Sequence, residues 1–413
     1  MGTMIGNVLV GQSGGPTSVI NSSLAGVFAG AKAAGAAKVY GMRHGIQGFL
    51  EGKVVDLDSI LKSGREVELL KRTPASFLGA CRFKFPAVEK GSEVYEKIFG
   101  YLRQYGIRYV FYIGGNDSMD TICKLYDYGR LIGSDICFMG VPKTIDNDLE
   151  ITDHTPGFGS AAKYVATMTK EIILDSHAND VKVVTVLEIM GRNAGWLTAS
   201  AALAKGEDNC GVDLIYLPEL PFDADKCLAS VQELMKTKKQ ITIAVSEGLW
   251  EDENHHLFDA ISQNAKVDAF GHKELSGVGE CIAKYLGKQL GCKVRAVNFS
   301  SIQRCGSHMA SKTDVDEAFQ VGLDAAKAAS NGVSGHMTIL KRLGDDPYVC
   351  VTDIYDVHKI ANAEKKVPRE WINENGDGMT EEFLHYVRPL IQGEMLPFMV
   401  NGLPAHLVLP EGQ

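Results

Sequence analysis

The residues best suited to chemistry stand together in one short stretch, Pro142-Lys143-Thr144-Ile145-Asp146-Asn147-Asp148. The apolar residues 136–141 come directly before it and predict a buried strand that ends in a polar loop. In an open parallel sheet, ligands bind beyond the carboxyl ends of the strands. An aspartate there can act as a general base, and a lysine beside it can neutralise a transferring phosphoryl group. Taken alone, the stretch also fits a turn in which Asp and Asn bond to their own backbone.

Two glycine-rich loops have the arrangement expected of anion sites. Residues 7–10 predict a strand, followed by glycines at 11, 14 and 15 and by a helical pattern over 19–28. Residues 109–113 predict a second strand, followed by Gly-Gly-Asn-Asp-Ser and a helix through 125, for which Ser118 is the expected N-cap. Backbone N–H groups at a helix N-terminus can face an anion. The first loop has neither the dinucleotide-binding nor the Walker A spacing, and a plain tight turn explains it equally well.

The elements that must position these loops follow an alternating pattern. Further strands are predicted at 181–189, 212–217, 241–245 and 293–299, and helices at 92–105, 161–177, 224–235 and 314–329. Such alternation predicts an α/β fold of two Rossmann-like, doubly wound domains that face each other across a cleft.

Composition narrows the function further. The chain has 413 residues, of which 45% are hydrophobic and 23% charged, as in ordinary globular proteins of two domains. A net charge of −9 argues against a nucleic-acid partner, so a phosphate site must be a local basic cluster. No apolar run approaches a membrane span and the start lacks a signal-peptide pattern, so we expect a cytoplasmic protein without a membrane partner. The nine scattered cysteines, never spaced Cys-x-x-Cys, suggest free thiols and no zinc site.

The set of motifs resembles the phosphofructokinase family, in the variant of its pyrophosphate-dependent branch. ATP-dependent members usually carry glycine at the position of Lys143 in the Pro-Lys-Thr-Ile-Asp-Asn-Asp string. The resemblance covers roughly residues 5 to 335. It implies Mg²⁺-dependent, reversible phosphoryl transfer from pyrophosphate to the 1-hydroxyl of fructose 6-phosphate, in glycolysis. It also implies that Asp146 is the general base, that Thr144 positions the substrate, and that Lys143 and Arg82 neutralise the leaving phosphate.

The resemblance extends to the loops that would bind the phosphoryl donor. Gly15 would let the donor approach the main chain, and Gly79-Ala80-Cys81-Arg82-Phe83 looks like the loop that brings an arginine to the transferring phosphate. Asp117 stands where ATP-dependent members usually have glycine, so its charge would repel a nucleotide's α-phosphate. Asn116 replaces the aspartate expected as magnesium ligand; its amide oxygen can bind Mg²⁺ but adds no charge.

Three further segments match the family's sugar-phosphate site. They are Met190-Gly191-Arg192, Glu247 after the strand at 241–245, and the group Arg295, Ser301 and Arg304. The two arginines of that group resemble the pair that binds the 6-phosphate, and Arg295 would reach in from a neighbouring subunit, which implies a homodimer or homotetramer with shared sites. The chain departs from the family at Ser301, where histidine or tyrosine is common. The stretch just before Met190 also offers only Lys182, not the arginine that many members contribute across the subunit interface. Each of the charged residues among them, taken alone, could equally form a surface salt bridge.

The resemblance also suggests a division of the chain. Residues 1–156 with about 303–345 would bind the phosphoryl donor, and about 157–302 would bind the sugar phosphate. Residues about 346–413 would be an extension packed on the body, in which we identify no function. The alternatives are an ATP-dependent 6-phosphofructokinase, a non-catalytic sugar-phosphate-binding subunit, and an enzyme that also accepts a longer sugar phosphate.

Overall fold

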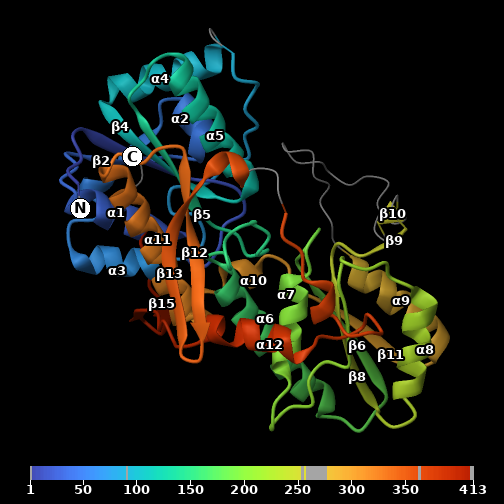
Figure 1. The fold of residues 1–413 in the computed structure, drawn as a ribbon. Coiled ribbons are helices and arrows are strands. Elements are labelled where there is room, and N and C mark those ends of the chain that lie inside the picture. Colours follow the sequence, from blue (N-terminus) through green and yellow to red (C-terminus); the bar gives the residue numbers. More distant parts are fainter. Residues whose placement is uncertain (1, 90–91, 253–254, 257–276, 361–363, 410–413) are drawn as a thin grey trace.

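The structure, a computed structural model, describes residues 2–89, 92–252, 255–256, 277–360 and 364–409. Two lobes lie side by side, each built on its own sheet (Figure 1). Among the described residues, no helix is long and apolar enough to cross a membrane.

The first lobe contains a seven-stranded sheet in the order β13-β12-β5-β4-β1-β2-β3. The five central strands are parallel, and the edge strands β3 and β13 run antiparallel to their neighbours. The strands are β1 (Asn7–Gln12), β2 (Val39–Met42), β3 (Val54–Asp56), β4 (Ile107–Gly114), β5 (Cys137–Pro142), β12 (His336–Asp345) and β13 (Tyr348–Asp356). The helices are α1 (Ile20–Ala33), α2 (Gly45–Leu50), α3 (Gly64–Arg72), α4 (Glu93–Gln104), α5 (Asn116–Leu131) and α11 (Lys312–Ser330).

The chain returns to the first lobe late, through α11 and β12. Helix α11 packs against α1 so closely that glycine is required on both helices. A Cβ atom at Gly26 would lie 2.0 Å from the carbonyl oxygen of Phe319, and one at Gly322 would lie 2.2 Å from that of Ser23. The helix predicted at 314–329 therefore packs back on the first lobe, as expected.

The second lobe contains a four-stranded parallel sheet in the order β11-β6-β8-β7. Its strands are β6 (Val183–Ile189), β7 (Leu214–Tyr216), β8 (Gln240–Ser246) and β11 (Lys293–Asn298), and a short ribbon adds β9 (Trp250–Asp252) and β10 (His255–His256). Its helices are α6 (Phe158–His177), α7 (Trp196–Ala199), α8 (Ala224–Leu234), α9 (Val278–Leu290) and α10 (Ile302–Cys305). The predicted fold class is confirmed: two doubly wound α/β units face each other.

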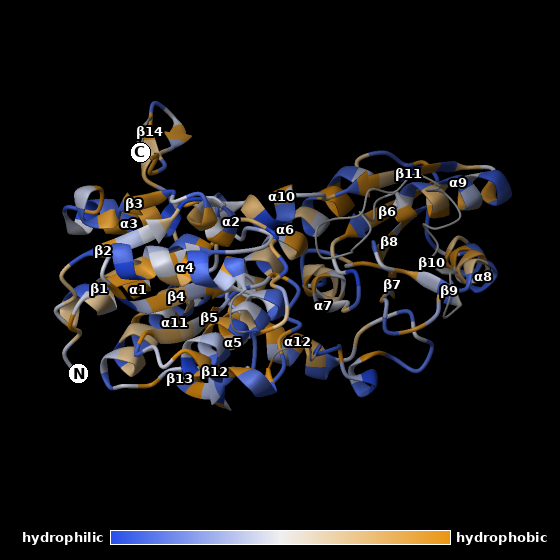
Figure 2. Ribbon diagram, turned by 90° about the horizontal axis from the view of Figure 1, so that it is seen from above, coloured by the Kyte–Doolittle hydropathy of each residue, from blue (hydrophilic) through white to orange (hydrophobic). Residues whose placement is uncertain are grey.

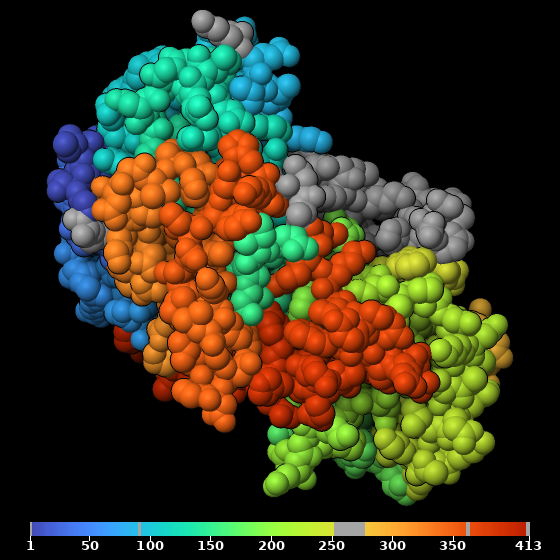
Figure 3. All heavy atoms as spheres, viewed as in Figure 1, coloured from blue at the N-terminus to red at the C-terminus, as the bar shows by residue number. Residues whose placement is uncertain are grey.

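The C-terminal residues cover both lobes. In Figure 3 the orange and red atoms of residues beyond 340 lie across the first lobe and continue onto the second. Val367, Ile372, Phe383 and Val387 are buried in the second lobe's core, and α12 (Glu381–Val387) lies in the segment predicted to be ordered. The final hairpin, β14 (Met399–Val400) and β15 (Leu403–Pro404), stands away from the body in Figure 2.

One predicted detail is wrong. Ser118 is not the N-cap of α5, because this helix begins two residues earlier, at Asn116, with Gly115 as its extended N-cap residue. The glycine pair ends the strand and starts the helix without a separate capping residue, so Ser118 lies in the first turn. The other predicted strands and helices agree with the structure, mostly within a few residues at each end.

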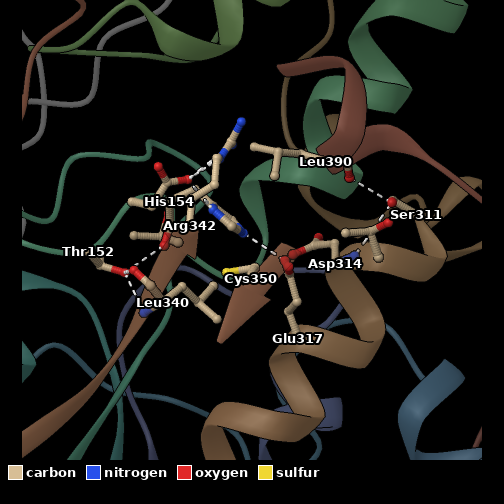
Figure 4. A network of polar contacts seen from close by, with 12 residues as sticks. Thr152, His154, Ser311, Asp314, Glu317, Leu340, Arg342, Cys350 and Leu390 are labelled. Carbon is tan, nitrogen blue, oxygen red and sulfur yellow. Dashed lines mark hydrogen bonds and ion pairs between the residues drawn. The ribbon is translucent and has the colours of Figure 1, made fainter. Parts of the chain in front are cut away.

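A largely buried network of charged residues links the segment after β5 with α11 and β12 (Figure 4). The imidazole of His154 is 1% exposed, with Nδ1 2.8 Å from an oxygen of Asp153 and Nε2 2.7 Å from an oxygen of Glu317. The guanidinium of Arg342 pairs with the same Asp153, and Tyr348 donates a hydrogen bond to Glu317. Burial lowers the pKa of His154, but the two carboxylates outweigh it and raise this pKa to about 9. His154 is therefore an imidazolium at neutral pH.

Two described groups bring histidine, cysteine and carboxylate atoms together, one of His154, Glu317 and Cys350 and another of Cys123, Asp127 and His358. In both groups the two imidazole nitrogens already contact carboxylates. We therefore interpret both groups as ion pairs.

The His154 ion pairs predict a pH-dependent contribution to stability. Because the folded-state pKa is raised above the unfolded value of about 6.5, the contribution is complete below that pH and is lost as the pH rises through about 9. For His154→Gln we expect a lower melting temperature than the wild type at pH 6, by the equivalent of up to ~3 kcal/mol, and a much smaller difference at pH 9.5. Melting curves of both chains across this range test it, and a difference that stays constant would contradict the assignment.

Candidate active site

A polar cavity of about 320 Å³ lies between the two lobes. The loops after β1, β4 and β5 line it from the first lobe, and the loops after β6 and β8 line it from the second. All of the predicted site residues line this cavity except Gly191, Arg295 and Ser301. Strands that are far apart in the sequence thus bring their carboxyl ends to one place, as expected for doubly wound sheets.

The loop after β5 places a lysine and an aspartate in the cavity. Lys143 is 4% exposed, and its Nζ donates a hydrogen bond of 2.7 Å to the carbonyl oxygen of Gly15. The Thr144 hydroxyl accepts a hydrogen bond from the Asp146 amide at 3.1 Å and lies 3.4 Å from the Asp146 carboxylate. Asn147 has a positive φ of 54°, so the chain turns sharply between Asp146 and Asp148. Lys143 therefore connects the loop after β5 with the glycine loop after β1.

Burial shifts the pKa values of the ionisable groups in this loop and beside it. Burial raises the pKa of Asp146, while the nearby Lys143 and the Thr144 hydroxyl act in the opposite direction. Burial also lowers the pKa of Lys143 to about 8, and the pKa of Arg82 is lowered first by burial and then by the nearby Arg192 and Arg304. An aspartate of raised pKa beside a buried lysine is suited to accept a proton while positive charge remains close.

The glycine loops form the first-lobe wall of the cavity. The amide of Gly14 donates to the carbonyl oxygen of Cys81 at 3.2 Å, which holds the Arg82 loop against the loop after β1. Asp117 lies in the first turn of α5, which begins at Asn116. The side-chain oxygen of Asn116 is buried and has no hydrogen-bond partner among the described residues. A buried oxygen without a hydrogen-bond partner is suited to bind a cation or an ordered water.

The second-lobe wall carries Met190, Arg192 and Glu247. Burial, together with the charge of Asp146, raises the pKa of Glu247 to about 7. Gly191 does not line the cavity; its amide donates to the Glu247 carboxylate at 3.4 Å. Its φ is 141°, and a Cβ atom there would lie 2.6 Å from the carbonyl oxygen of Ala194. Gly191 therefore supports Glu247 from outside the cavity.

Two other predicted residues lie outside the cavity. Arg295 is on the edge strand β11, where its guanidinium bonds to Asp175 at 3.0 Å and to the hydroxyls of Thr185 and Ser176 at 3.0 and 2.7 Å. Ser301 is exposed at the start of α10. Arg304, three residues further, does line the cavity. The two arginines thus do not meet within a single chain.

The sequence interpretation did not identify several lining residues as site residues, among them Asp148, Asn193 and Glu364. Asp148 could have been found as the second carboxylate of the loop; burial, with Asp146 next, raises its pKa to about 7. Glu364 follows the first lobe's last strand and accepts a hydrogen bond of 2.9 Å from Asn193. Its main chain pairs with Leu149 beside the catalytic loop. No local sequence signal marks Glu364.

The fold belongs to the two-lobed, doubly wound α/β class, and its cavity combines cations with carboxylates, as phosphoryl transfer requires. The sequence model described as Phosphofructokinase matches residues 7–329. The chain belongs to the phosphofructokinase family.

Individual relatives agree with this assignment. A "Pyrophosphate--fructose 6-phosphate 1-phosphotransferase" of Halomonas elongata is 40% identical over 402 residues, which cover 96% of this chain and 94% of the relative. The crystal structure of a pyrophosphate-dependent phosphofructokinase from Marinobacter aquaeolei is 36% identical, with a TM-score of 0.86 and coverage of 99% of this chain and 97% of that one. One from Nitrosospira multiformis is 33% identical, with a TM-score of 0.87 and 98% coverage of both chains.

Proposed function

We propose that this chain transfers a phosphoryl group from inorganic pyrophosphate to the 1-hydroxyl of fructose 6-phosphate, giving fructose 1,6-bisphosphate and phosphate. The observation that carries the proposal is the buried Lys143, whose Nζ bonds to Gly15 of the glycine loop beside Asp146. The names of the similar proteins support pyrophosphate as donor. We also propose that the reaction is reversible and belongs to glycolysis.

Asp146 is the general base of the proposed reaction. Its carboxylate takes the proton from the 1-hydroxyl of the sugar while that oxygen attacks the nearer phosphorus of pyrophosphate, and the bond to the departing phosphate breaks. Thr144, whose hydroxyl lies 3.4 Å from the Asp146 carboxylate, positions the reacting hydroxyl. Lys143 and Arg82 neutralise the charge of the departing phosphate, and such prearranged cations are the main catalytic device of phosphoryl transfer.

The sugar phosphate binds at the second-lobe wall. Arg192 and Arg304 contact its 6-phosphate, since guanidinium groups bind phosphate in a bidentate manner. Glu247 accepts hydrogen bonds from sugar hydroxyls, and Met190 packs against the sugar. Arg295 lies on an edge strand away from its own cavity, so we propose that it completes the 6-phosphate site of a neighbouring subunit near that subunit's Ser301, in a homodimer or homotetramer.

Magnesium is the expected cofactor, and the residues present fit it. The buried side-chain oxygen of Asn116 has no hydrogen-bond partner among the described residues, and Asp117 beside it offers a carboxylate. Mg²⁺ commonly binds proteins through one or two such oxygens, with water and substrate phosphates as its other ligands. When bound it would screen the charge of the phosphoryl donor.

The arrangement of charge in the first lobe favours pyrophosphate over ATP. Asp117, an exposed carboxylate at the start of α5, lines the cavity where we place a nucleotide's α-phosphate, and like charges repel. We also propose a division of the chain, in which residues 1–156 and about 303–345 bind the phosphoryl donor and about 157–302 bind the sugar phosphate.

We further propose a cytoplasmic location, which the nine free cysteines support.

The test is an initial-rate comparison with fructose 6-phosphate and Mg²⁺, with pyrophosphate or ATP as donor at equal concentration. We expect turnover with pyrophosphate, little or none with ATP, and none after chelation of the metal. Preference for ATP would contradict the reading of Lys143 and Asp117. Absence of turnover with either donor would favour a sugar-phosphate-binding subunit or a longer sugar phosphate such as sedoheptulose 7-phosphate.

A further inference from the structure

The C-terminal helix α12 reaches the catalytic loop through one hydroxyl group. Tyr386 is 9% exposed, and its hydroxyl accepts a hydrogen bond of 3.0 Å from the side-chain amide of Asn147. The same hydroxyl donates a bond of 2.6 Å to the carbonyl oxygen of Asp153. Tyr386 therefore bridges both ends of the segment that follows Asp146, although it lies more than 200 residues later in the chain.

The residue held by this bridge is the one that turns the loop. Asn147 is fully buried and has the left-handed φ of 54°, which is unfavourable for residues other than glycine, though asparagine tolerates it best. Its two side-chain atoms are both used: the oxygen accepts from the amide of Thr155 at 3.0 Å, and the nitrogen donates to Tyr386. Asp146 and Asp148 stand on either side and both line the cavity. The turn at Asn147 therefore sets where both carboxylates point.

Tyr386 itself is held firmly. The guanidinium of Arg342 lies 4.6 Å from the centre of its ring and also pairs with Asp153. The rings of Trp196 and Trp371 lie 5.5 and 5.2 Å away. A hydroxyl fixed on a rigid ring can impose its position on the softer loop, whereas a hydroxyl on a mobile side chain cannot.

We infer that Tyr386 is a positioning residue of the reaction, acting through Asn147 to hold the turn that aims Asp146 at the sugar hydroxyl. The inference rests on the proposed function. It assigns to the C-terminal segment a part in catalysis that no local sequence pattern indicates. Substrate binding depends on groups of the other wall, such as Arg192 and Glu247, and is not expected to change with Tyr386.

The test is Tyr386→Phe, which removes the hydroxyl and leaves the ring. We expect kcat to fall about 10- to 100-fold, since small displacements of a reacting group cost that much. The KM for fructose 6-phosphate should stay within about threefold of the wild type, since kcat and KM separate when only the reacting geometry is changed. The matched control is Tyr348→Phe, which removes a partly buried hydroxyl that donates to Glu317 at 2.6 Å. The Tyr348 ring also packs against the guanidinium of Arg342, but among the described residues no hydrogen bond joins its hydroxyl to the loop. Its kcat should equal that of the wild type, and an equal loss in both variants would overturn the inference.

A double-mutant cycle shows whether Tyr386 acts through Asn147. Asn147→Gly keeps the left-handed turn accessible but removes the side chain that Tyr386 holds. If the inference is correct, Tyr386→Phe has almost no further effect on kcat in the Asn147→Gly background. If the two substitutions instead lower kcat by independent factors that multiply in the double variant, the inference is overturned. If Tyr386→Phe does not fold, Asn147→Gly alone decides: it should lower kcat at unchanged KM, and a normal kcat would overturn the inference. A wild-type chain without turnover would instead contradict the proposed function.

Discussion

Asp146→Asn is expected to lower turnover with pyrophosphate and fructose 6-phosphate by a factor of about 10² to 10⁴, the usual contribution of a general base. The asparagine side chain has nearly the same shape but cannot accept the proton of the 1-hydroxyl. Fructose 6-phosphate should still bind within a few-fold of the wild type, because its phosphate is contacted by Arg192 and Arg304. Turnover assays and calorimetric titration of the sugar phosphate measure the two effects separately.

Two results would count against this assignment. Near-wild-type turnover of Asp146→Asn would remove Asp146 from the mechanism. A loss of sugar-phosphate binding as large as the loss of turnover would show that the substitution disturbs the cavity as a whole. Asp148 lines the same cavity and has a pKa of about 7. If Asp148→Asn but not Asp146→Asn stopped turnover, the role of base would move to Asp148.

Lys143→Met is expected to lower kcat by about 10² to 10³, the usual cost of removing one prearranged group that stabilises a developing charge. Methionine fills the buried volume but carries no charge and cannot bond to Gly15. In the wild type, the lysine is charged below its pKa of about 8 and loses that charge above it. An alkaline decrease of kcat/KM near pH 8 should therefore be present in the wild type and absent from the residual activity of the variant.

A matched control separates lost charge from lost packing. Lys163 is also largely buried, with a 12% exposed side chain, and its Nζ bonds to the carbonyl oxygen of Gly393 at 2.7 Å, outside the cavity. Lys163→Met should leave kcat unchanged. If both methionine variants lost activity equally, or if Lys143→Met kept most of its activity, a charge role for Lys143 would be wrong.

The sequence was sufficient for those parts of the site that depend on local pattern. Residues 136–141 were recognised as a strand because they are apolar and bounded by polar residues, and β5 covers Cys137–Pro142. The loops after the strands then fall at one cavity, because parallel strands present their carboxyl ends at one edge. Even where boundaries differ, the cause is local: α6 begins at Phe158, three residues earlier than expected, directly after Gly157 at a φ of 113°.

Other parts could not be predicted because they depend on contacts between distant segments. Glu364 and Tyr386 reach the catalytic loop only after the chain has crossed both lobes, and nothing in their neighbouring residues signals it. Arg295 is expected to act in the site of a neighbouring subunit; within one chain it bonds to Asp175 on α6, and the shared site stays a prediction. The buried imidazolium of His154 likewise needs Asp153 next to it and Glu317 from α11, more than 160 residues later.

The late return of the chain to the first lobe bears on how the protein is made. Strand β12 takes its place beside β5, and α11 covers α1, so this sheet and its core lack essential parts in a nascent chain that has only passed β5. The ribosome must add roughly 200 further residues first, which takes about 10 to 40 s at typical elongation rates. During that time α1 exposes to chaperones the surface that α11 will cover. Neither lobe can therefore finish folding early, because the sheet of the first waits for β12 and the core of the second waits for residues as late as Val387 of α12.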